Sequence, residues 1–189
     1  EWLSTLFQKM LLGDIVARYK VKNVNALSFI VKKLSESVKQ PISYTRLTQL
    51  VSSLGEKIQT NTLIDYLRFL EESCIVISIK NFASRFVERE GLKKYYFCDN
   101  GILNLFLMDG HTSLLENIVA LNLKRIYGDD VYFYRKNVEV DFYIPAQAEL
   151  IQVSYTVNDA ETKRREADSL LRTADFPGAK SLKIITMKN

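Results

Sequence analysis

Residues 139–157, EVDFYIPAQAELIQVSYTV, combine two short apolar strands with polar side chains that could bind a metal ion. Asp141 lies on the first strand, and Gln152 and Ser154 occupy alternate positions on the second. Residues two apart face the same side of a strand, so these polar groups are expected to converge. A magnesium-dependent nuclease uses an Asp on one strand and Glu-x-Lys on its neighbour. Here the second strand offers Gln-x-Ser, so the sequence predicts the outline of such a site without its full set of charges.

The segment after Gly110 contains the elements that would position this site. Its pattern predicts a helix over about 114–127, strands over 131–135, 139–144 and 150–155, a charged helix capped by Asn158 and running to about Arg172, and a last strand over 181–186. This order of elements predicts an α/β sandwich with a mixed sheet.

The first 110 residues predict helices followed by a hairpin. Apolar side chains recur at three-to-four spacing in four stretches, which carry Trp2 to Val16, Leu27 to Val38, Leu47 to Leu54, and Leu63 to Leu70. Ser43 and Asn61 are candidate N-caps of the third and fourth helices. Apolar runs over 74–79 and 94–98 then predict two strands, joined by the charged segment 80–93. Helices followed by a hairpin are the pattern of a winged helix.

Composition limits the class of protein. The chain has 189 residues, of which 47% are hydrophobic and 25% charged, as is typical of a globular protein of one or two small domains. Its apolar runs are too short to span a bilayer, and no signal-peptide pattern opens it, so no membrane partner is expected. Because it begins at Glu1 without a Met, we expect a fragment of a longer protein. Cys74 and Cys98 are interpreted as buried, reduced thiols of a cytoplasmic protein.

Several stretches are similar to a known family. KKYYFCDNGILNLFL, LLENIVALNLKR, VYFYRKNVEVDFYI, LIQVSYTVNDAETKRREADSL and KIITM resemble, in order, the C-terminal part of a large group of bacterial and archaeal AAA-type ATPases. LLGDIVARYKVKN and NTLIDYLRFLEESCIVISI match the same group. The resemblance implies a winged-helix region over 1–110 and a restriction-endonuclease-like domain of the PD-(D/E)XK type over 111–189. It also implies a preceding P-loop ATPase domain that binds ATP and is a partner of this region; no Gly-x-x-x-x-Gly-Lys-Ser/Thr occurs in the chain itself.

The resemblance also assigns site residues. Glu116 takes the helix position of the nuclease centre, Asp141 the strand position and Gln152 the third. In that family the acids hold a divalent cation that activates water at the scissile phosphate, so Glu116 and Asp141 would bind Mg²⁺ weakly here. Ser154 stands where the family has a Lys, which makes the site degenerate. Lys136 or Lys163 could replace that charge.

Each site residue has a structural alternative. Ser113-Leu-Leu-Glu116 has the spacing of a capping box, which would explain Glu116 as a helix N3 residue. Asp141 could pair with Arg135 or Lys136. The amide of Gln152 could be satisfied by a neighbouring backbone group.

Charge placement indicates where nucleic acid could bind. Residues 1–110 contain 15 basic and 11 acidic side chains, whereas residues 111–189 contain 11 of each. The candidate recognition helix, 61–73, has Asp65, Glu71 and Glu72 against one Arg68, so base reading in a major groove is not expected of it. The hairpin segment supplies the candidate phosphate contacts, which are Lys80, Arg85, Arg89, Lys93 and Lys94. Tyr95, Tyr96 and Phe97 are interpreted as strand core.

Two functions follow from different classes. The first is an accessory region of an ATPase that binds DNA, a partner protein or its own ATPase domain. The second is a metal-dependent nuclease coupled to that ATPase.

Overall fold

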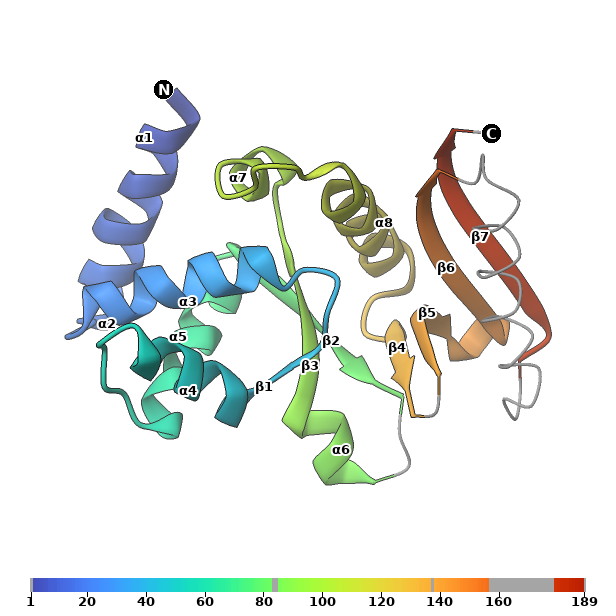
Figure 1. Cartoon of the computed structure of the whole chain (residues 1–189), viewed down its shortest axis with the longest axis horizontal. Helices are drawn as coiled ribbons and strands as arrows, with labels where there is room; N and C mark the ends of the chain where they lie inside the picture. Colours follow the sequence, from blue (N-terminus) through green and yellow to red (C-terminus); the bar gives the residue numbers. More distant parts are fainter. Residues whose placement is uncertain (1, 83–84, 137, 157–178, 189) are drawn as a thin grey trace. The chain divides into compact units, whose positions relative to one another are not determined.

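The structure is a computed structural model that describes residues 2–82, 85–136, 138–156 and 179–188. It is a mixed α+β fold with helices at the N-terminus and one seven-stranded mixed sheet, in the strand order β1-β3-β2-β4-β5-β6-β7 (Figure 1). This architecture is consistent with the predicted α/β sandwich. The helices are α1 (Trp2–Gln8), α2 (Ala17–Tyr19), α3 (Val24–Glu36), α4 (Tyr44–Ser53), α5 (Thr60–Glu72), α6 (Phe86–Gly91), α7 (Asn100–Asn104) and α8 (His111–Tyr127), with the π-helical η1 (Lys9–Val16) and the 3₁₀ turn η2 (Pro145–Gln147). The strands are β1 (Ile42–Ser43), β2 (Val76–Asn81), β3 (Leu92–Phe97), β4 (Tyr132–Arg135), β5 (Glu139–Ile144), β6 (Glu149–Thr156) and β7 (Ser181–Lys188).

The chain divides into two compact units. The first contains Glu1–Ser78 and Lys94–Gly110, and the second contains Ile79–Lys93 and His111–Asn189. The segment between β2 and β3 therefore belongs to the same unit as the C-terminal strands, although it lies within the first 110 residues of the chain.

The helices of the first unit bury the stripes that their spacing predicts. Their buried side chains include Phe7, Leu11, Ile15, Leu27, Ile30, Leu34, Leu47, Val51, Leu63 and Leu70. Burial of aliphatic side chains of this size contributes roughly 1.5–3 kcal/mol each. Trp2 departs from the pattern, because it is 75% exposed at the start of α1.

Side-chain caps define where two of these helices begin. Asn23 caps α3 by accepting a hydrogen bond from the Ala26 amide at 2.9 Å. Ser43 caps α4 as predicted, by accepting from the Arg46 amide at 3.2 Å. Gly55 follows α4 with φ +95°, which suits a glycine just beyond a helix end. The prediction for α5 was wrong, because its N-cap is Gln59 and Asn61 lies within the first turn.

The predicted strands after residue 110 are confirmed. β5 pairs with β4 and with β6 in antiparallel fashion, and β7 pairs with β6 in parallel. Residues 131–155 therefore supply three adjacent strands, as their period-two pattern predicts. The helix predicted from Asn158 to Arg172 lies outside the described residues.

β5 is buried along most of its length. It is a central strand, paired with β4 along one edge and with β6 along the other. Val140, Tyr143 and Leu150 form one buried cluster. Helix α8 packs against β6. β6 and β7 are also tied by Glu149, which accepts a hydrogen bond from Ser181 at 3.1 Å and pairs with Lys183 at 2.8 Å. The strands that carry the candidate site thus form the core of the second unit.

Candidate functional site

Asp141 and Gln152 face each other on neighbouring strands. The register Phe142↔Ile151 makes them the next cross-strand neighbours after the last ladder pair of β5 and β6. The Val153 amide donates to Asp141 Oδ2 at 2.9 Å, and the Asp141 amide donates to Gln152 Oε1 at 3.3 Å. The structure therefore brings these two predicted site residues together, on one edge of the β5–β6 pair.

In this geometry the side chains of Asp141 and Gln152 both have a structural role. Each accepts a backbone N–H from the opposite strand, directly beyond the ladder pair Phe142↔Ile151 of β5 and β6. A buried backbone N–H without an acceptor is unfavourable, so the two side chains extend the pairing of the strands. The alternative interpretation of Gln152, an amide satisfied by neighbouring backbone, is confirmed.

Glu116 lies on α8 and is buried beside Asn117. The helix begins at His111, so Ser113 lies inside the first turn. The capping-box interpretation of Glu116 was therefore wrong, because a residue inside the helix cannot serve as its N-cap. A buried carboxylate is retained only where it has polar partners, and Glu116 does have interactions in this structure. Since α8 packs against β6, it lies next to the strand that carries Gln152.

The position at which the resemblance leads us to expect a lysine is occupied by a small polar residue, Ser154. Ser154 is half-buried on β6 and pairs in register with Thr186 of β7. Of the two candidate replacements, Lys136 is exposed at the turn after β4, where its amide donates to the Val138 carbonyl at 3.1 Å. Lys163 lies outside the described residues. Within the part of the chain that the structure describes, no three His, Cys, Asp or Glu side chains are grouped as a metal site would require.

The five predicted phosphate contacts are not equivalent. Lys94 is fully buried on β3, so its inclusion was wrong: a buried ammonium is not available to a phosphate on the surface. Lys80 pairs with Glu90 at 2.7 Å, and Lys93 pairs with the same carboxylate at 3.7 Å. The hydrogen bond between Lys80 and Glu90 raises the pKa of the lysine and lowers the pKa of the glutamate. Arg85 is exposed at the start of α6, and Arg89 is half-buried.

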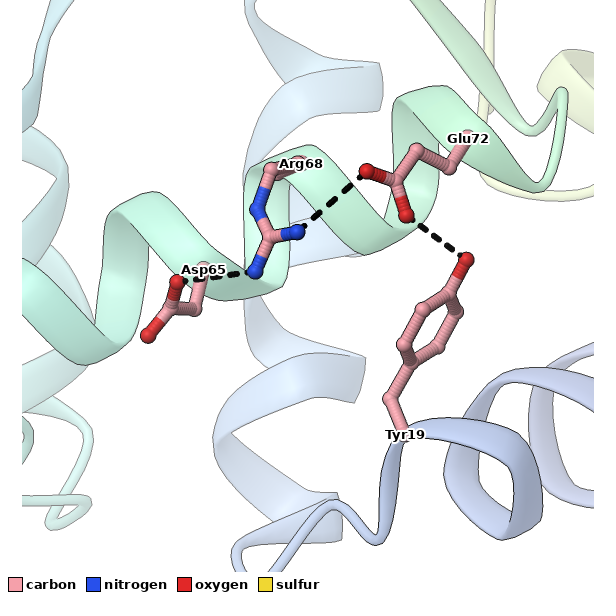
Figure 2. Close-up of polar contacts among 4 residues, drawn as sticks. All are labelled: Tyr19, Asp65, Arg68 and Glu72. Atoms are coloured by element: carbon pink, nitrogen blue, oxygen red, sulfur yellow. Dashed lines mark hydrogen bonds and ion pairs between the residues drawn. The ribbon is translucent and has the colours of Figure 1, made fainter.

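Arg68, the one cation of α5, is held by acids of its own helix (Figure 2). Its guanidinium bonds Asp65 at 3.2 Å and Glu72 at 3.3 Å, and the Tyr19 hydroxyl donates to Glu72 at 2.8 Å. The hydrogen bond to Asp65 is the main cause of the raised pKa of Arg68. The ring of Phe69 stacks on the ring of Tyr19, with centroids 4.0 Å apart. The guanidinium carbon of Arg68 lies over the Phe69 ring, 5.0 Å from its centroid. This network connects α5 to α2 and leaves an acidic helix surface.

The charged segment between β2 and β3 contains a feature that the sequence interpretation missed. Residues 86–91 form α6, and its first two side chains, Phe86 and Val87, are 67% and 79% exposed. In the sequence, the signal for this exposed pair was two adjacent apolar residues inside a charged stretch. By contrast, Tyr95, Tyr96 and Phe97 are buried, which confirms their interpretation as strand core.

The cysteines are free thiols, but the prediction that both are buried was wrong. Cys74 is exposed just after α5, with a left-handed φ of +53°. Cys98 is half-buried at the end of β3, and burial raises the pKa of its thiol to about 11. The Cys98 amide donates to the Ile75 carbonyl at 3.0 Å, so the chain passes close to Cys74 at this point.

Comparison with known proteins identifies the family. Residues 1–113 match the family described as a domain of unknown function, DUF8612. The chain belongs to this family. The matched residues contain the whole helical part of the first unit together with β2, α6 and β3. The family therefore includes the segment with the exposed α6 side chains.

Two relatives extend the match toward the C-terminus. An uncharacterized protein of Methanocaldococcus jannaschii is 27% identical over 171 residues, which make up 87% of this chain and 37% of that protein. An uncharacterized protein of Haemophilus influenzae is 27% identical over 180 residues, or 92% of this chain and 44% of that protein. The chain thus spans less than half the length of these relatives. No solved structure matches it. In the described ranges, no helix has the length and hydropathy needed to cross a bilayer.

Proposed function

We propose that this chain is an accessory region of a longer AAA-type ATPase, and that it binds DNA weakly and without sequence preference. The relationship to AAA-type ATPases rests on the resemblance of the sequence stretches, and ATP would bind in a P-loop domain outside this chain. The length of the two relatives supports the proposal, because it leaves room for a further domain. We place the parent protein in the cytoplasm, where free thiols such as Cys74 and Cys98 persist.

One observation favours DNA over a protein partner: the charges between β2 and β3. We call Lys80, Arg85, Arg89 and Lys93 the basic segment. Lys80 and Lys93 compensate Glu90, so this acid does not repel a phosphate. Arg85 is exposed at the start of α6. On α5, by contrast, Asp65 and Glu72 hold Arg68, so the helix presents mainly negative charge. Phosphate contacts of this kind carry binding that is independent of sequence.

The test reverses charge in the basic segment. The triple variant Arg85→Glu, Arg89→Glu, Lys93→Glu should weaken duplex binding and flatten the dependence of log K on log salt by about one unit per lost contact. Because the Lys93 side chain is only 13% exposed and pairs with Glu90, we expect a change of about two units. The measurement is fluorescence anisotropy of a labelled duplex titrated at several salt concentrations.

A matched control distinguishes the effect of the basic segment from the effect of the net charge of the whole chain. Lys9, Lys20 and Lys39 are exposed in the first unit, and changing all three to Glu alters the net charge of the chain equally. This control should keep most of the affinity. If the basic-segment variant binds as the wild type does, or if no binding occurs at low salt, the region is a protein-docking module instead.

The alternative function is a metal-dependent nuclease. It is favoured by the position of Asp141 beside Gln152 and by the buried carboxylate of Glu116 on the helix that packs against β6. Against it, Asp141 already accepts a backbone N–H, and Gln152 and Ser154 lack the charges that the chemistry requires. Cleavage of DNA that depends on a divalent cation is the result that would support it.

A further inference from the structure

Helix α5 ends in a turn of a kind that usually contains a glycine. The Ile75 amide donates to the Leu70 carbonyl at 2.9 Å, and the Cys74 amide donates to the Glu71 carbonyl at 3.0 Å. These two bonds form a Schellman motif, in which the residue just beyond the helix adopts a left-handed conformation. Cys74 occupies that position with φ +53°. A glycine takes this conformation without strain, whereas a residue with a Cβ does so at a cost in stability.

The Cys74 side chain lies at the surface, although the turn around it is well packed. Ile75 and Leu70, the two residues joined by the longer-range bond of the motif, are 1% and 0% exposed, whereas Cys74 is exposed. Its side chain therefore adds little to the hydrophobic core in return for the backbone strain. Strained backbone conformations of this kind are concentrated where a side chain has a function.

The second cysteine lies beside the first. The Cys98 amide, directly after β3, donates to the carbonyl of Ile75, the residue that follows Cys74, at 3.0 Å. Burial raises the pKa of the Cys98 thiol to about 11, and the neighbouring Cys74 adds to this rise, so the two thiols are close enough to interact. Both are free thiols of the first unit, and the chain contains no other cysteine.

The chain between the two cysteines leaves the first unit and returns to it. It passes into the second unit after Ser78 and comes back at Lys94. Cys74 precedes this excursion and Cys98 follows it. A bond between the two sulfurs would therefore close the whole excursion, with β2, α6 and β3, into one covalent loop.

We propose that Cys74 and Cys98 form a reversible disulfide by exchange with a low-molecular-weight disulfide such as oxidised glutathione. Cys74 loses its proton to water, and its thiolate attacks one sulfur of the reagent; a mixed disulfide forms and one glutathione thiolate leaves. Cys98 then loses its proton, attacks the Cys74 sulfur and releases the second glutathione. In total the two cysteines give up two electrons and two protons, and the glutathione disulfide is reduced to two thiols.

The two thiols have different roles in this exchange. Cys74 is exposed and meets the reagent, whereas the half-buried Cys98, with its raised pKa, offers little thiolate to a reagent in solution. Cys98 reacts once the mixed disulfide is held next to it, because proximity replaces a collision from solution. Disulfides of cytoplasmic proteins are usually transient ones of this kind, which act in catalysis or in redox sensing.

The test is mass spectrometry of the chain after incubation in glutathione buffers of increasing oxidised fraction. The wild type should lose two hydrogen atoms, and a digest should contain a peptide pair linked through Cys74 and Cys98. Dithiothreitol should restore both thiols. The variant Cys98→Ser should stop at the mixed disulfide on Cys74. The oxidised wild type should also have a higher urea midpoint than the reduced protein, because a closed loop restricts the unfolded chain.

Cys74→Gly is the matched variant that keeps the fold. A glycine suits φ +53°, so this variant should resist urea at least as well as the reduced wild type. It has no partner for Cys98, so its urea midpoint should not respond to the oxidised fraction of the buffer.

The outcomes are distinct. Two free thiols in the wild type at every glutathione ratio would overturn the proposal, as would a disulfide between two copies of the chain in place of the internal one. A glutathione adduct that forms on Cys98 in Cys74→Gly as fast as it forms on Cys74 in Cys98→Ser would contradict the assigned roles. An internal disulfide that forms in the wild type, is reversed by dithiothreitol and is lost in both variants would establish it.

Discussion

At the scale of single residues, the polar side chains of β5 and β6 stabilise the sheet. Asp141 accepts the Val153 amide at 2.9 Å, and Gln152 accepts the Asp141 amide at 3.3 Å. Carboxylates that accept backbone N–H groups form stronger hydrogen bonds than neutral acceptors do. Asp141, the residue to which the sequence resemblance assigns a metal-ligand position, thus holds two strands together.

Asp141→Ala should destabilise the protein, whereas Asp141→Asn should do so much less. The alanine leaves the Val153 amide without its acceptor, which costs about 1–3 kcal/mol, but the asparagine keeps an acceptor oxygen in place. Urea unfolding followed by circular dichroism measures the difference. Gln152→Ala should have a smaller effect, since its bond is longer. Equal destabilisation by alanine and asparagine would show that the charge matters and not the acceptor.

At the scale of elements, helices α4 and α5 each follow an N-cap residue with nearly the same extended backbone geometry. Ser43 precedes α4 with φ −91° and ψ 154°, and Gln59 precedes α5 with φ −83° and ψ 153°. Only Ser43 of these two caps its helix with a side-chain hydrogen bond in the described structure. A glutamine is too long to accept from the helix amides that a serine reaches at this position.

The two cap positions provide opposite expectations for stability. Ser43→Ala should lower the free energy of unfolding by about 1 kcal/mol, because it removes the bond to the Arg46 amide. Gln59→Ser should raise it by up to about 1 kcal/mol, because the extended backbone is already suited to capping. Urea midpoints of both variants and of the double variant provide the measurement. The two changes lie on different helices and should be additive. A serine at 59 that leaves the midpoint unchanged would contradict the argument.

At the scale of the whole molecule, the second unit has the strand arrangement of a sandwich but an incomplete set of charges for nuclease chemistry. If the resemblance to nuclease-like domains assigns the positions correctly, Gln152 and Ser154 stand where a carboxylate and a lysine would be needed. Removal of one such stabilising group typically lowers a rate by about a hundred- to a thousandfold. We therefore expect no measurable cleavage of supercoiled, linear or single-stranded DNA with magnesium or manganese. Coupled groups need not add their effects, so the two losses are not multiplied.

The control for this experiment is Asp141→Asn, which removes the charge but keeps the acceptor for Val153. Cleavage that requires a divalent cation and disappears in Asp141→Asn would contradict the degenerate site. It would then make Lys136 a candidate for the relocated lysine, to be tested by Lys136→Ala.

The sequence alone determined the elements whose pattern is strictly periodic. The helical stretches within 2–16, 27–38, 47–54 and 63–70 and the strands over 131–135, 139–144 and 150–155 were predictable, because periods of 3.6 and 2 follow directly from which side chains must be buried. The convergence of Asp141 and Gln152 could be expected for the same reason, since alternation determines which side of each strand they face.

Only the tertiary structure decided which polar groups are available to a ligand. Lys80, Arg85 and Lys94 have similar sequence surroundings, yet one is ion-paired, one exposed and one fully buried. Exposure and pairing depend on atoms contributed by distant segments, which a local pattern does not contain. The exposure of Phe86 was hidden for the same reason: whether an apolar side chain lies in a core or on a surface is settled by what packs against it, and for Phe86 the structure leaves two thirds of its surface to solvent.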